Sequence, residues 1–291
     1  MGIERRSFLK LLGVTGITLA VGEQSISASE SVGTNDVEFN GVLYDSTRCV
    51  GCRTCEYSCA EAHHLADPLP DDKIAPVRKT DETCNTVVNK FQTKKGETFI
   101  KRQCMHCNEP ACAAACLTKA MFKNKTGPVT WDADKCMGCR YCMISCPFDS
   151  PKFEYHSANP KIQKCDMCFE RLKKEAKPAC AANCPNDALL YGKRRDLIKE
   201  ARRRIYQKPD LYIDHIYGER EAGGTGWLYL SSVPFDQLGL NTNLQKSSYP
   251  ELTKGFIYTV PSVFVLVPTL LMGIHQATKN NHLKEEKENE I

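Results

Sequence analysis

Sixteen of the seventeen cysteines in this 291-residue chain fall into four tight groups. That density is far above ordinary usage, yet the chain is too long for a small module held together by disulfides. Each group brings four thiols within a short stretch of chain, which is the spacing of ligands in a metal site. The groups are Cys49, Cys52, Cys55 and Cys59; Cys104, Cys107, Cys112 and Cys116; Cys136, Cys139, Cys142 and Cys146; and Cys165, Cys168, Cys180 and Cys184.

Two cysteine motifs alternate along the chain. The first and third groups read C-x2-C-x2-C-x3-C, which is the run found in bacterial ferredoxins. The second and fourth have wider gaps, C-x2-C-x4-C-x3-C and C-x2-C-x11-C-x3-C. Residues around the first and third groups also match in register, beginning with an aromatic residue and Asp at Tyr44-Asp45 and Trp131-Asp132. This order indicates a duplicated unit built from two motifs.

The spacing favours iron–sulfur clusters over other uses of cysteine. In the ferredoxin run, three closely spaced thiolates bind one [4Fe–4S] cluster and the fourth binds a second cluster. Gly51 and Gly138 would let these loops take positive φ. A structural zinc module is the alternative, but zinc takes four ligands and does not require the tight triplet. The sequence therefore predicts four [4Fe–4S] clusters, with Cys84 left over as a bystander thiol.

Both ends of the chain indicate export and a membrane. Arg5 and Arg6 precede an apolar stretch, as in a twin-arginine export signal. A second apolar stretch, residues 256–274, is long enough to cross a bilayer. Lysines in the tail after it fit a cytoplasmic tail and an exported body. The expected segments are a signal at 1–29, a four-cluster module at 40–192, a basic helix and extended partner-contacting segment at 193–254, a transmembrane helix at 255–275 and a charged tail at 276–291.

Several functions are excluded or not expected. The net charge of +4 is too small to indicate nucleic-acid binding. No nucleophile–base set, phosphate loop or dinucleotide fingerprint is present, so we expect no catalytic site in this chain. His63, His64 and His106 lie near cysteines, but each motif already has four thiols, so we expect no ligand role for them. His106 is expected to tune a cluster through a contact with its ligands.

The chain resembles the four-cluster iron–sulfur subunits of bacterial membrane oxidoreductases. The resemblance implies an α+β fold of two ferredoxin-like domains with two clusters each, followed by a C-terminal transmembrane helix. It runs from the export signal to the tail helix. The strings that carry it are Cys49-Val50-Gly51-Cys52, Gln103-Cys104-Met105-His106-Cys107, Gly138-Cys139-Arg140-Tyr141-Cys142-Met143 and Gly223-Gly224-Thr225.

The resemblance also implies which cysteines share a cluster, which spacing alone leaves open. In the family the two middle motifs exchange a ligand, and so do the two outer motifs. The long gap between Cys59 and Cys104 is typical of a surface excursion, and it disfavours an exchange of ligands between the first and second cysteine groups. The implied sets are tetrad 1 (Cys49, Cys52, Cys55, Cys184), tetrad 2 (Cys59, Cys165, Cys168, Cys180), tetrad 3 (Cys104, Cys107, Cys112, Cys146) and tetrad 4 (Cys116, Cys136, Cys139, Cys142).

Within this family the chain is most similar to the ferredoxin-like subunit of periplasmic hydrogenase-2 type [NiFe] hydrogenases. The strings 43–52 and Tyr217-Gly218-Glu219 favour that group. The resemblance implies the hydrogenase small and large subunits and an integral membrane quinone-reactive subunit as partners, at the periplasmic face of the cytoplasmic membrane. The alternatives are the beta subunit of a membrane-bound formate dehydrogenase, against which Arg5-Arg6 argues, and related molybdenum oxidoreductases with a molybdenum catalytic subunit.

Overall fold

The computed structural model describes residues 38–70 and 77–289, and it describes side chains as far as residue 278. The predicted export signal at 1–29, with Arg5 and Arg6, lies outside the described residues. Residues Val37–Leu252 form one compact unit, which holds every cysteine. The fold mixes helices and sheets as predicted, whereas its division into two ferredoxin-like domains stays a prediction.

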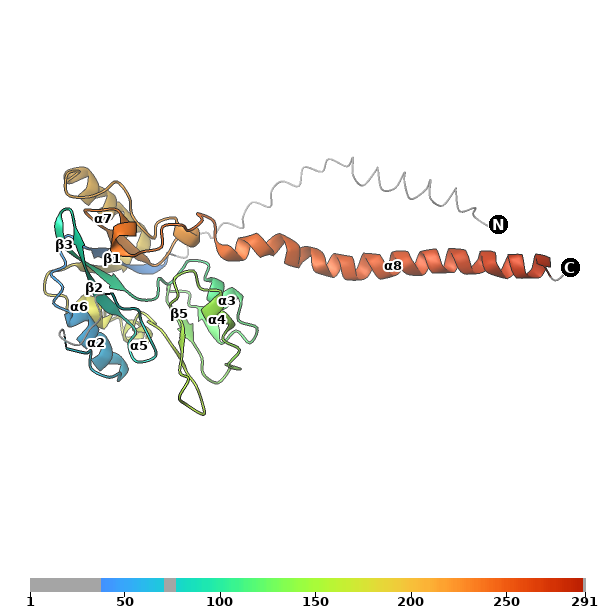
Figure 1. The fold of residues 1–291 in the computed structure, drawn as a ribbon, viewed down its shortest axis with the longest axis horizontal. Coiled ribbons are helices and arrows are strands. Elements are labelled where there is room, and N and C mark those ends of the chain that lie inside the picture. Colours follow the sequence, from blue (N-terminus) through green and yellow to red (C-terminus); the bar gives the residue numbers. More distant parts are fainter. Residues whose placement is uncertain (1–37, 71–76, 290–291) are drawn as a thin grey trace. The chain divides into compact units, whose positions relative to one another are not determined.

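A three-stranded sheet joins the two ends of the cysteine-rich region (Figure 1). Its central strand β1 (Asn40–Asp45) runs antiparallel to β8 (Leu189–Lys193) and parallel to β9 (Trp227–Leu230). β1 precedes the first cysteine motif and β8 follows the last one, so their pairing closes the cysteine-rich segment into one body. All four residues of β9 are buried, which makes this strand the centre of the core.

Helix α7 (Arg194–Gln207) covers one face of this sheet. Its buried residues Leu197 and Ala201 pack in one cluster with Leu43 of β1 and Leu228 of β9. The helix has an apolar stripe facing the sheet and basic residues elsewhere, as its sequence pattern predicts. It begins at Arg194, within the segment 193–254 for which the sequence predicts a basic helix.

Short hairpins and helices carry the cysteines. Each of the helices begins within or directly after a cysteine loop, so the motifs themselves fix the positions of these elements. The hairpins are β2 (Val87–Thr93) with β3 (Gly96–Arg102), β4 (Met121–Lys123) with β5 (Val129–Trp131), and β6 (Lys152–Phe153) with β7 (Ile162–Gln163). The helices are α2 (Thr54–His63), α3 (Ala111–Ala114), α4 (Tyr141–Ile144), α5 (Phe169–Lys173) and α6 (Ala179–Ala182).

One stretch differs from what the sequence predicts, and a second agrees with it. The expected surface excursion ends in strand β2, which pairs with β3 and has Val87 and Val88 buried on its two opposite faces. The stretch 219–244 has the composition of loop and short strand. It contains the 3-10 helices η2 (Glu221–Gly223) and η3 (Phe235–Leu238), and its strand is the fully buried β9.

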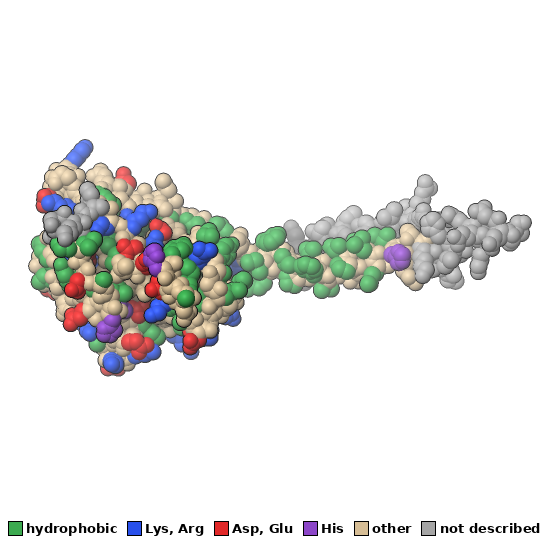
Figure 2. Space-filling model, turned by 60° about the horizontal axis from the view of Figure 1, so that its bottom comes forward, with side chains coloured by type: hydrophobic (Ala, Val, Ile, Leu, Met, Phe, Trp, Pro, Cys, Tyr) green, Lys and Arg blue, Asp and Glu red, His purple; other side chains and the backbone are tan. Residues whose placement is uncertain are grey.

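Helix α8 (Tyr249–Asn289) contains the predicted apolar stretch. Within its segment Tyr249–Thr278, the most apolar stretch of 18 residues has a mean hydropathy of 1.9, and none of that stretch is buried. Pro261 and Pro268 lie inside the helix without ending it. Hydrophobic side chains cover its described part, as Figure 2 shows. The helix is long and apolar enough to cross a membrane, as predicted for this part of the chain.

Candidate metal centres

The four C-x2-C loops share one backbone feature. In each loop the residue just before the second cysteine is left-handed: φ is 71° at Gly51, 50° at His106, 71° at Gly138 and 62° at Met167. The prediction of positive φ at the two glycines is confirmed. His106 and Met167 take the same conformation although side chains rarely adopt it, which costs about 1–2 kcal/mol per residue. The duplicated sequence therefore produces a loop geometry common to all four motifs.

This conformation aims backbone N–H groups at sulfur. The Met167 N–H donates to Cys165 Sγ at 3.4 Å, and the Gly51 N–H donates to Cys49. The Met121 N–H donates to Cys116 Sγ at 3.4 Å. Hydrogen bonds of this kind stabilise a thiolate and tune the potential of a bound cluster.

The outer motifs bring the thiols of tetrads 1 and 2 together. Burial raises the pKa of Cys49, and the nearby thiols of Cys184 and Cys52 raise it further. Burial likewise raises the pKa of Cys59 to about 12, and the nearby thiols of Cys180 and Cys168 contribute to the rise. Helix α2, which carries Cys59, packs against helix α6, which carries Cys180 of the same tetrad.

The middle motifs bring the thiols of tetrads 3 and 4 together in the same way. Burial raises the pKa of Cys107, and the nearby Cys104, Cys146 and Cys112 thiols add to the rise. Burial raises the pKa of Cys142 to about 11, with contributions from the other three thiols of tetrad 4. Each predicted tetrad therefore has electrostatic neighbours drawn from both of its motifs, while the assignment of ligands to clusters stays a prediction.

Neighbouring thiols also connect one tetrad to the next. Cys55 of tetrad 1 interacts with Cys180 of tetrad 2. Cys165 of tetrad 2 interacts with Cys104 of tetrad 3. Cys112 of tetrad 3 interacts with Cys142 of tetrad 4, which completes a series in the order 1, 2, 3, 4. The two exposed cysteines, Cys52 and Cys139, belong to the first and last tetrads.

The chemistry of these residues fits iron–sulfur clusters. All seventeen cysteines are free thiols, and six of them are buried. His106 is fully buried; its Nδ1 accepts a hydrogen bond from the Val129 N–H at 2.9 Å, which leaves the proton on Nε2. That Nε2 has no hydrogen-bond partner among the described residues. A buried N–H donor beside Cys107 suits the thiolate or sulfide acceptors of a cluster.

Comparison with known proteins supports this interpretation. The model of the 4Fe-4S dicluster domain matches residues 96–194, which include the second, third and fourth cysteine groups. A protein of Nitratidesulfovibrio vulgaris is 46% identical over 95% of this chain and 77% of its own length. The hydrogenase-2 operon protein HybA of Escherichia coli O157:H7 is 33% identical over 96% of this chain and 97% of its own. A subunit of the anaerobic dimethyl sulfoxide reductase of Escherichia coli is 32% identical over 64% and 93%.

The chain belongs to the family of 4Fe–4S ferredoxin-type subunits of oxidoreductases. Membership of this ferredoxin-type family accounts for the alternating motifs and for the shared loop geometry. It also favours iron–sulfur clusters over a structural zinc module, because the matched 4Fe-4S dicluster domain spans the second, third and fourth cysteine groups.

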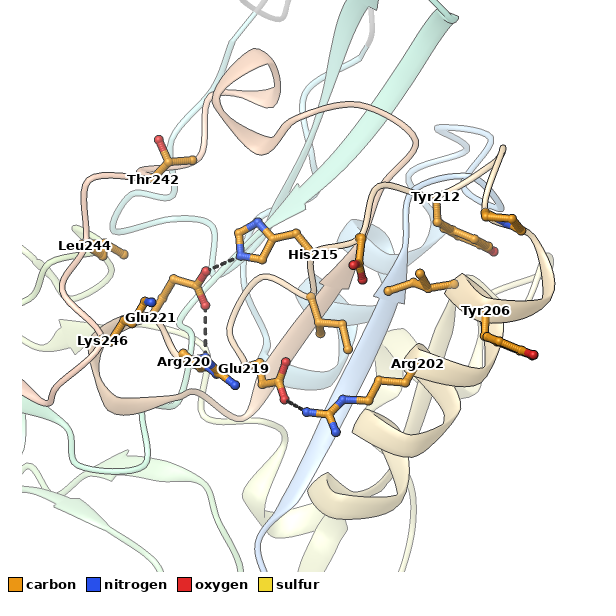
Figure 3. A pocket seen from close by; sticks show the side chains of 14 residues that line it. Arg202, Tyr206, Tyr212, His215, Glu219, Arg220, Glu221, Thr242, Leu244 and Lys246 are labelled. Carbon is orange, nitrogen blue, oxygen red and sulfur yellow. Dashed lines mark hydrogen bonds and ion pairs between the residues drawn. The ribbon is translucent and has the colours of Figure 1, made fainter.

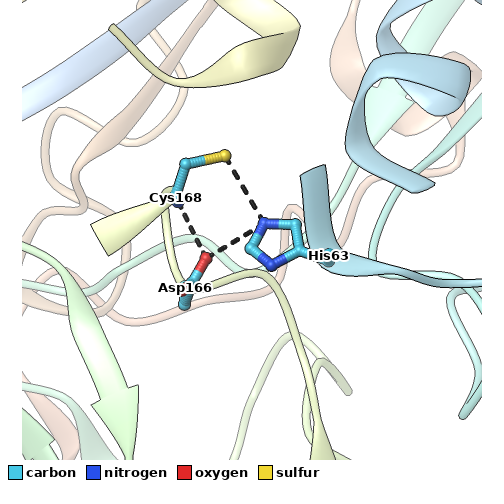
Figure 4. Close-up of side chains that lie close together, drawn as sticks. All are labelled: His63, Asp166 and Cys168. Carbon is cyan, nitrogen blue, oxygen red and sulfur yellow. Dashed lines mark hydrogen bonds and ion pairs between the residues drawn. The ribbon is translucent and has the colours of Figure 1, made fainter. Parts of the chain in front are cut away.

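One histidine of this ferredoxin-type subunit lies closer to a predicted ligand than its sequence position indicates. His63 Nε2 is 3.4 Å from Cys168 Sγ and 3.3 Å from a carboxylate oxygen of Asp166 (Figure 4). His63 comes from the end of α2 and Cys168 from a loop 105 residues later. No sequence signal joins them, because the contact depends on the packing of distant segments. The expectation that the histidines here are not ligands stays a prediction.

Sequence reasoning also misses two buried lysines. Lys101 is 1% exposed on β3, and Lys164 is 7% exposed next to Cys165. Lysine is almost always a surface residue, so neither position carries a signal in the sequence. Cys84, by contrast, belongs to none of the predicted tetrads, and burial raises its pKa to about 11.

A cleft of about 970 Å³ lies on the α7 side of the ferredoxin-type body (Figure 3). His215 Nε2 contacts Glu221 at 2.7 Å on its wall, and Arg202 pairs with Glu219. Its lining, drawn from the described residues, includes no cysteine, so the cleft is separate from the tetrads. These charged groups are already paired with each other, so they do not form a convergent set aimed into the cavity.

Proposed function

We propose that this subunit relays single electrons through four [4Fe–4S] clusters between a catalytic subunit and a quinone-reactive membrane subunit. The observation that carries the proposal is the series of four thiol tetrads with an exposed cysteine at each end. A relay needs its redox centres close to one another and its end centres close to the surface, where partners exchange electrons. A single buried cluster would meet neither requirement.

In the proposed assignment, each tetrad holds one cluster. The clusters supply the one-electron chemistry, and the protein supplies position and potential. Backbone N–H groups at the cysteine loops donate to sulfur, which favours the reduced and more negative state. Burial in the core has the opposite effect, because a less polar surrounding disfavours added charge. The balance of the two differs from tetrad to tetrad.

The catalytic partner we infer is a [NiFe] hydrogenase with its small and large subunits. The support is the match to the hydrogenase-2 operon protein HybA, which covers nearly the full length of both proteins. The match to the dimethyl sulfoxide reductase subunit stops at 64% of this chain. That relative supports a second candidate, a molybdenum oxidoreductase, in which the same relay would serve a different catalytic subunit.

The location we infer is the periplasmic face of the cytoplasmic membrane. The apolar helix α8 would anchor the body, and the twin-arginine element would direct export of the folded, cluster-loaded protein. The lysine-bearing tail would then stay in the cytoplasm.

Two measurements test the proposal. The full-length chain, produced anaerobically, is expected to contain about sixteen iron and sixteen acid-labile sulfide, four of each per cluster. Zinc without sulfide would refute the relay. The complex that co-purifies with the chain from detergent-extracted membranes is expected to contain nickel and no molybdenum or tungsten. Molybdenum or tungsten without nickel would contradict the hydrogenase assignment and leave the relay intact.

A further inference from the structure

Lys101 occupies an unusual position for a cationic side chain. It lies on β3 near the end of the hairpin, and its side chain is among the largest that are fully buried in the unit. Burying an ammonium group in a protein core is costly unless hydrogen bonds and a counter-charge compensate for the lost water. The surroundings of Lys101 therefore have to supply both.

Two neutral side chains accept hydrogen bonds from Lys101, and each of them donates its own proton to a different group. Lys101 Nζ donates to Thr86 Oγ1 at 2.5 Å and to Gln103 Oε1 at 3.1 Å. Thr86 donates its own proton to the Arg102 carbonyl, and the Gln103 amide donates to the Tyr229 hydroxyl. Both groups therefore present only acceptors to Lys101. This network therefore requires Lys101 Nζ to be the donor of both hydrogen bonds, and it fixes the position of Nζ.

The remaining face of the ammonium lies over an aromatic ring. Lys101 Nζ is 4.7 Å from the centroid of Trp227, which is itself fully buried. The two hydrogen bonds and this cation–π contact account for the three N–H donors of an ammonium group. Each of the three N–H donors of the protonated lysine therefore has a partner.

The counter-charge is not a carboxylate. Within the described residues no Asp or Glu forms an ion pair with Lys101, although many surface lysines form one. Burial alone would lower the pKa of Lys101, but the nearby thiols of Cys180, Cys55, Cys165 and Cys59 outweigh it and raise the pKa. One of these cysteines belongs to tetrad 1 and three belong to tetrad 2. Cys180 and Cys55 also pack in the same buried cluster as Trp227, whose ring Lys101 Nζ contacts. The groups that face this lysine are therefore the predicted ligands of two successive clusters.

We propose that Lys101 is a fixed counter-charge between the clusters of tetrads 1 and 2, and that it raises the reduction potential of both. This inference rests on the proposed relay. When a cluster gains an electron, its net charge becomes more negative, and a buried cation stabilises that state more than the oxidised one. No proton moves and no bond changes in this role. Lys101 acts by position alone, and the electron comes from the redox partner or from a chemical reductant.

The test is a potentiometric titration of the cluster-loaded, full-length chain in detergent, followed by electron paramagnetic resonance. Lys101→Met removes the charge and keeps the length of the side chain. We expect two of the clusters to become at least about tenfold harder to reduce, which is a downward shift of about 59 mV for a one-electron couple. Lys101→Gln is the second neutral variant, because its amide can still donate to Thr86 and Gln103.

Two controls separate charge from packing. Lys94→Met removes an exposed lysine from the turn of the same hairpin and is expected to leave all potentials unchanged. Lys101→Arg keeps the charge and is expected to keep the potentials close to those of the wild type. Unchanged potentials in both neutral variants, with full iron and sulfide, would overturn the inference, as would an equal shift in the Arg variant. Absence of clusters from the wild-type chain would instead refute the relay itself.

Discussion

The duplicated cysteine loops offer a matched pair of substitutions, Gly51→Ala and Gly138→Ala. Both glycines have φ of 71° and stand at the same position of the same motif. Their surroundings differ. A Cβ at position 51 would lie 2.2 Å from a ring carbon of Phe99, whereas a Cβ at position 138 would meet no atom within 4 Å. The pair therefore separates backbone strain from steric overlap.

The magnitudes follow from these contacts. An alanine in the left-handed region costs about 1–2 kcal/mol, and this part is common to both variants. At position 51 the ring must also move, although the Tyr44 hydroxyl donates to the Phe99 carbonyl at 2.9 Å and fixes its backbone. Overpacking of this kind adds about 1–3 kcal/mol. We expect a total destabilisation of about 2–5 kcal/mol for Gly51→Ala, against about 1–2 for Gly138→Ala.

The assay is the iron content of the anaerobically purified chain, together with the temperature at which its visible cluster absorbance is lost. Gly138→Ala is expected to keep most of its iron, while Gly51→Ala loses iron and bleaches at a lower temperature. The double variant Gly51→Ala/Phe99→Ala should recover part of the loss, because the overlapping ring is gone. Equal effects of the two single variants, or no recovery in the double variant, would refute the reasoning.

Three further predictions follow from single residues. Glu56→Gln removes a buried carboxylate that accepts hydrogen bonds from two arginines. It is expected to destabilise the unit by about 3–5 kcal/mol and to lower the temperature at which the cluster absorbance is lost. An unchanged temperature would contradict this prediction. Cys84→Ser should keep the full iron and sulfide content, and a loss of four iron atoms would make Cys84 a ligand. Burial raises the pKa of Cys59 to about 12 and of Cys168 to about 11, so both thiols are protonated at pH 7 without iron. Reconstitution should therefore release protons, detectable with a dye in weak buffer, and should slow as the pH falls from 8 to 6.

The ligand chemistry could be predicted because it is encoded locally. Three thiols within seven residues can be read without knowing the fold, and the need for positive φ at Gly51 follows from the loop they must form. The apolar helix α8 could be predicted for the same reason, since its length and hydropathy are properties of one continuous stretch. The grouping of cysteines across motifs depends on long-range packing, and only the resemblance to a family suggested it.

The parts that could not be predicted are those set by distant neighbours. Strand β2 lies in a stretch rich in Asp, Lys and Thr, yet Val87 and Val88 are buried on its two faces, and the Val88 N–H donates to the Glu56 carboxylate of α2. His63 reaches Cys168 only because α2 packs near the last motif. Lys101 lies next to Arg102 in a run of polar residues, so its burial could not be read from the sequence pattern.

Duplication repeats the cysteine motifs, but it does not make the surroundings of the repeated loops the same. The loops at Gly51 and Gly138 have the same φ, yet the first packs against Phe99 and the second has open space beside it. The two buried lysines differ as well: Lys101 lies between tetrads 1 and 2, whereas Lys164 faces Cys104 and Cys112 of tetrad 3 and Cys165 of tetrad 2. Clusters with the same ligands in unequal surroundings have unequal potentials. The profile of potentials along such a series is therefore set by the residues around the motifs.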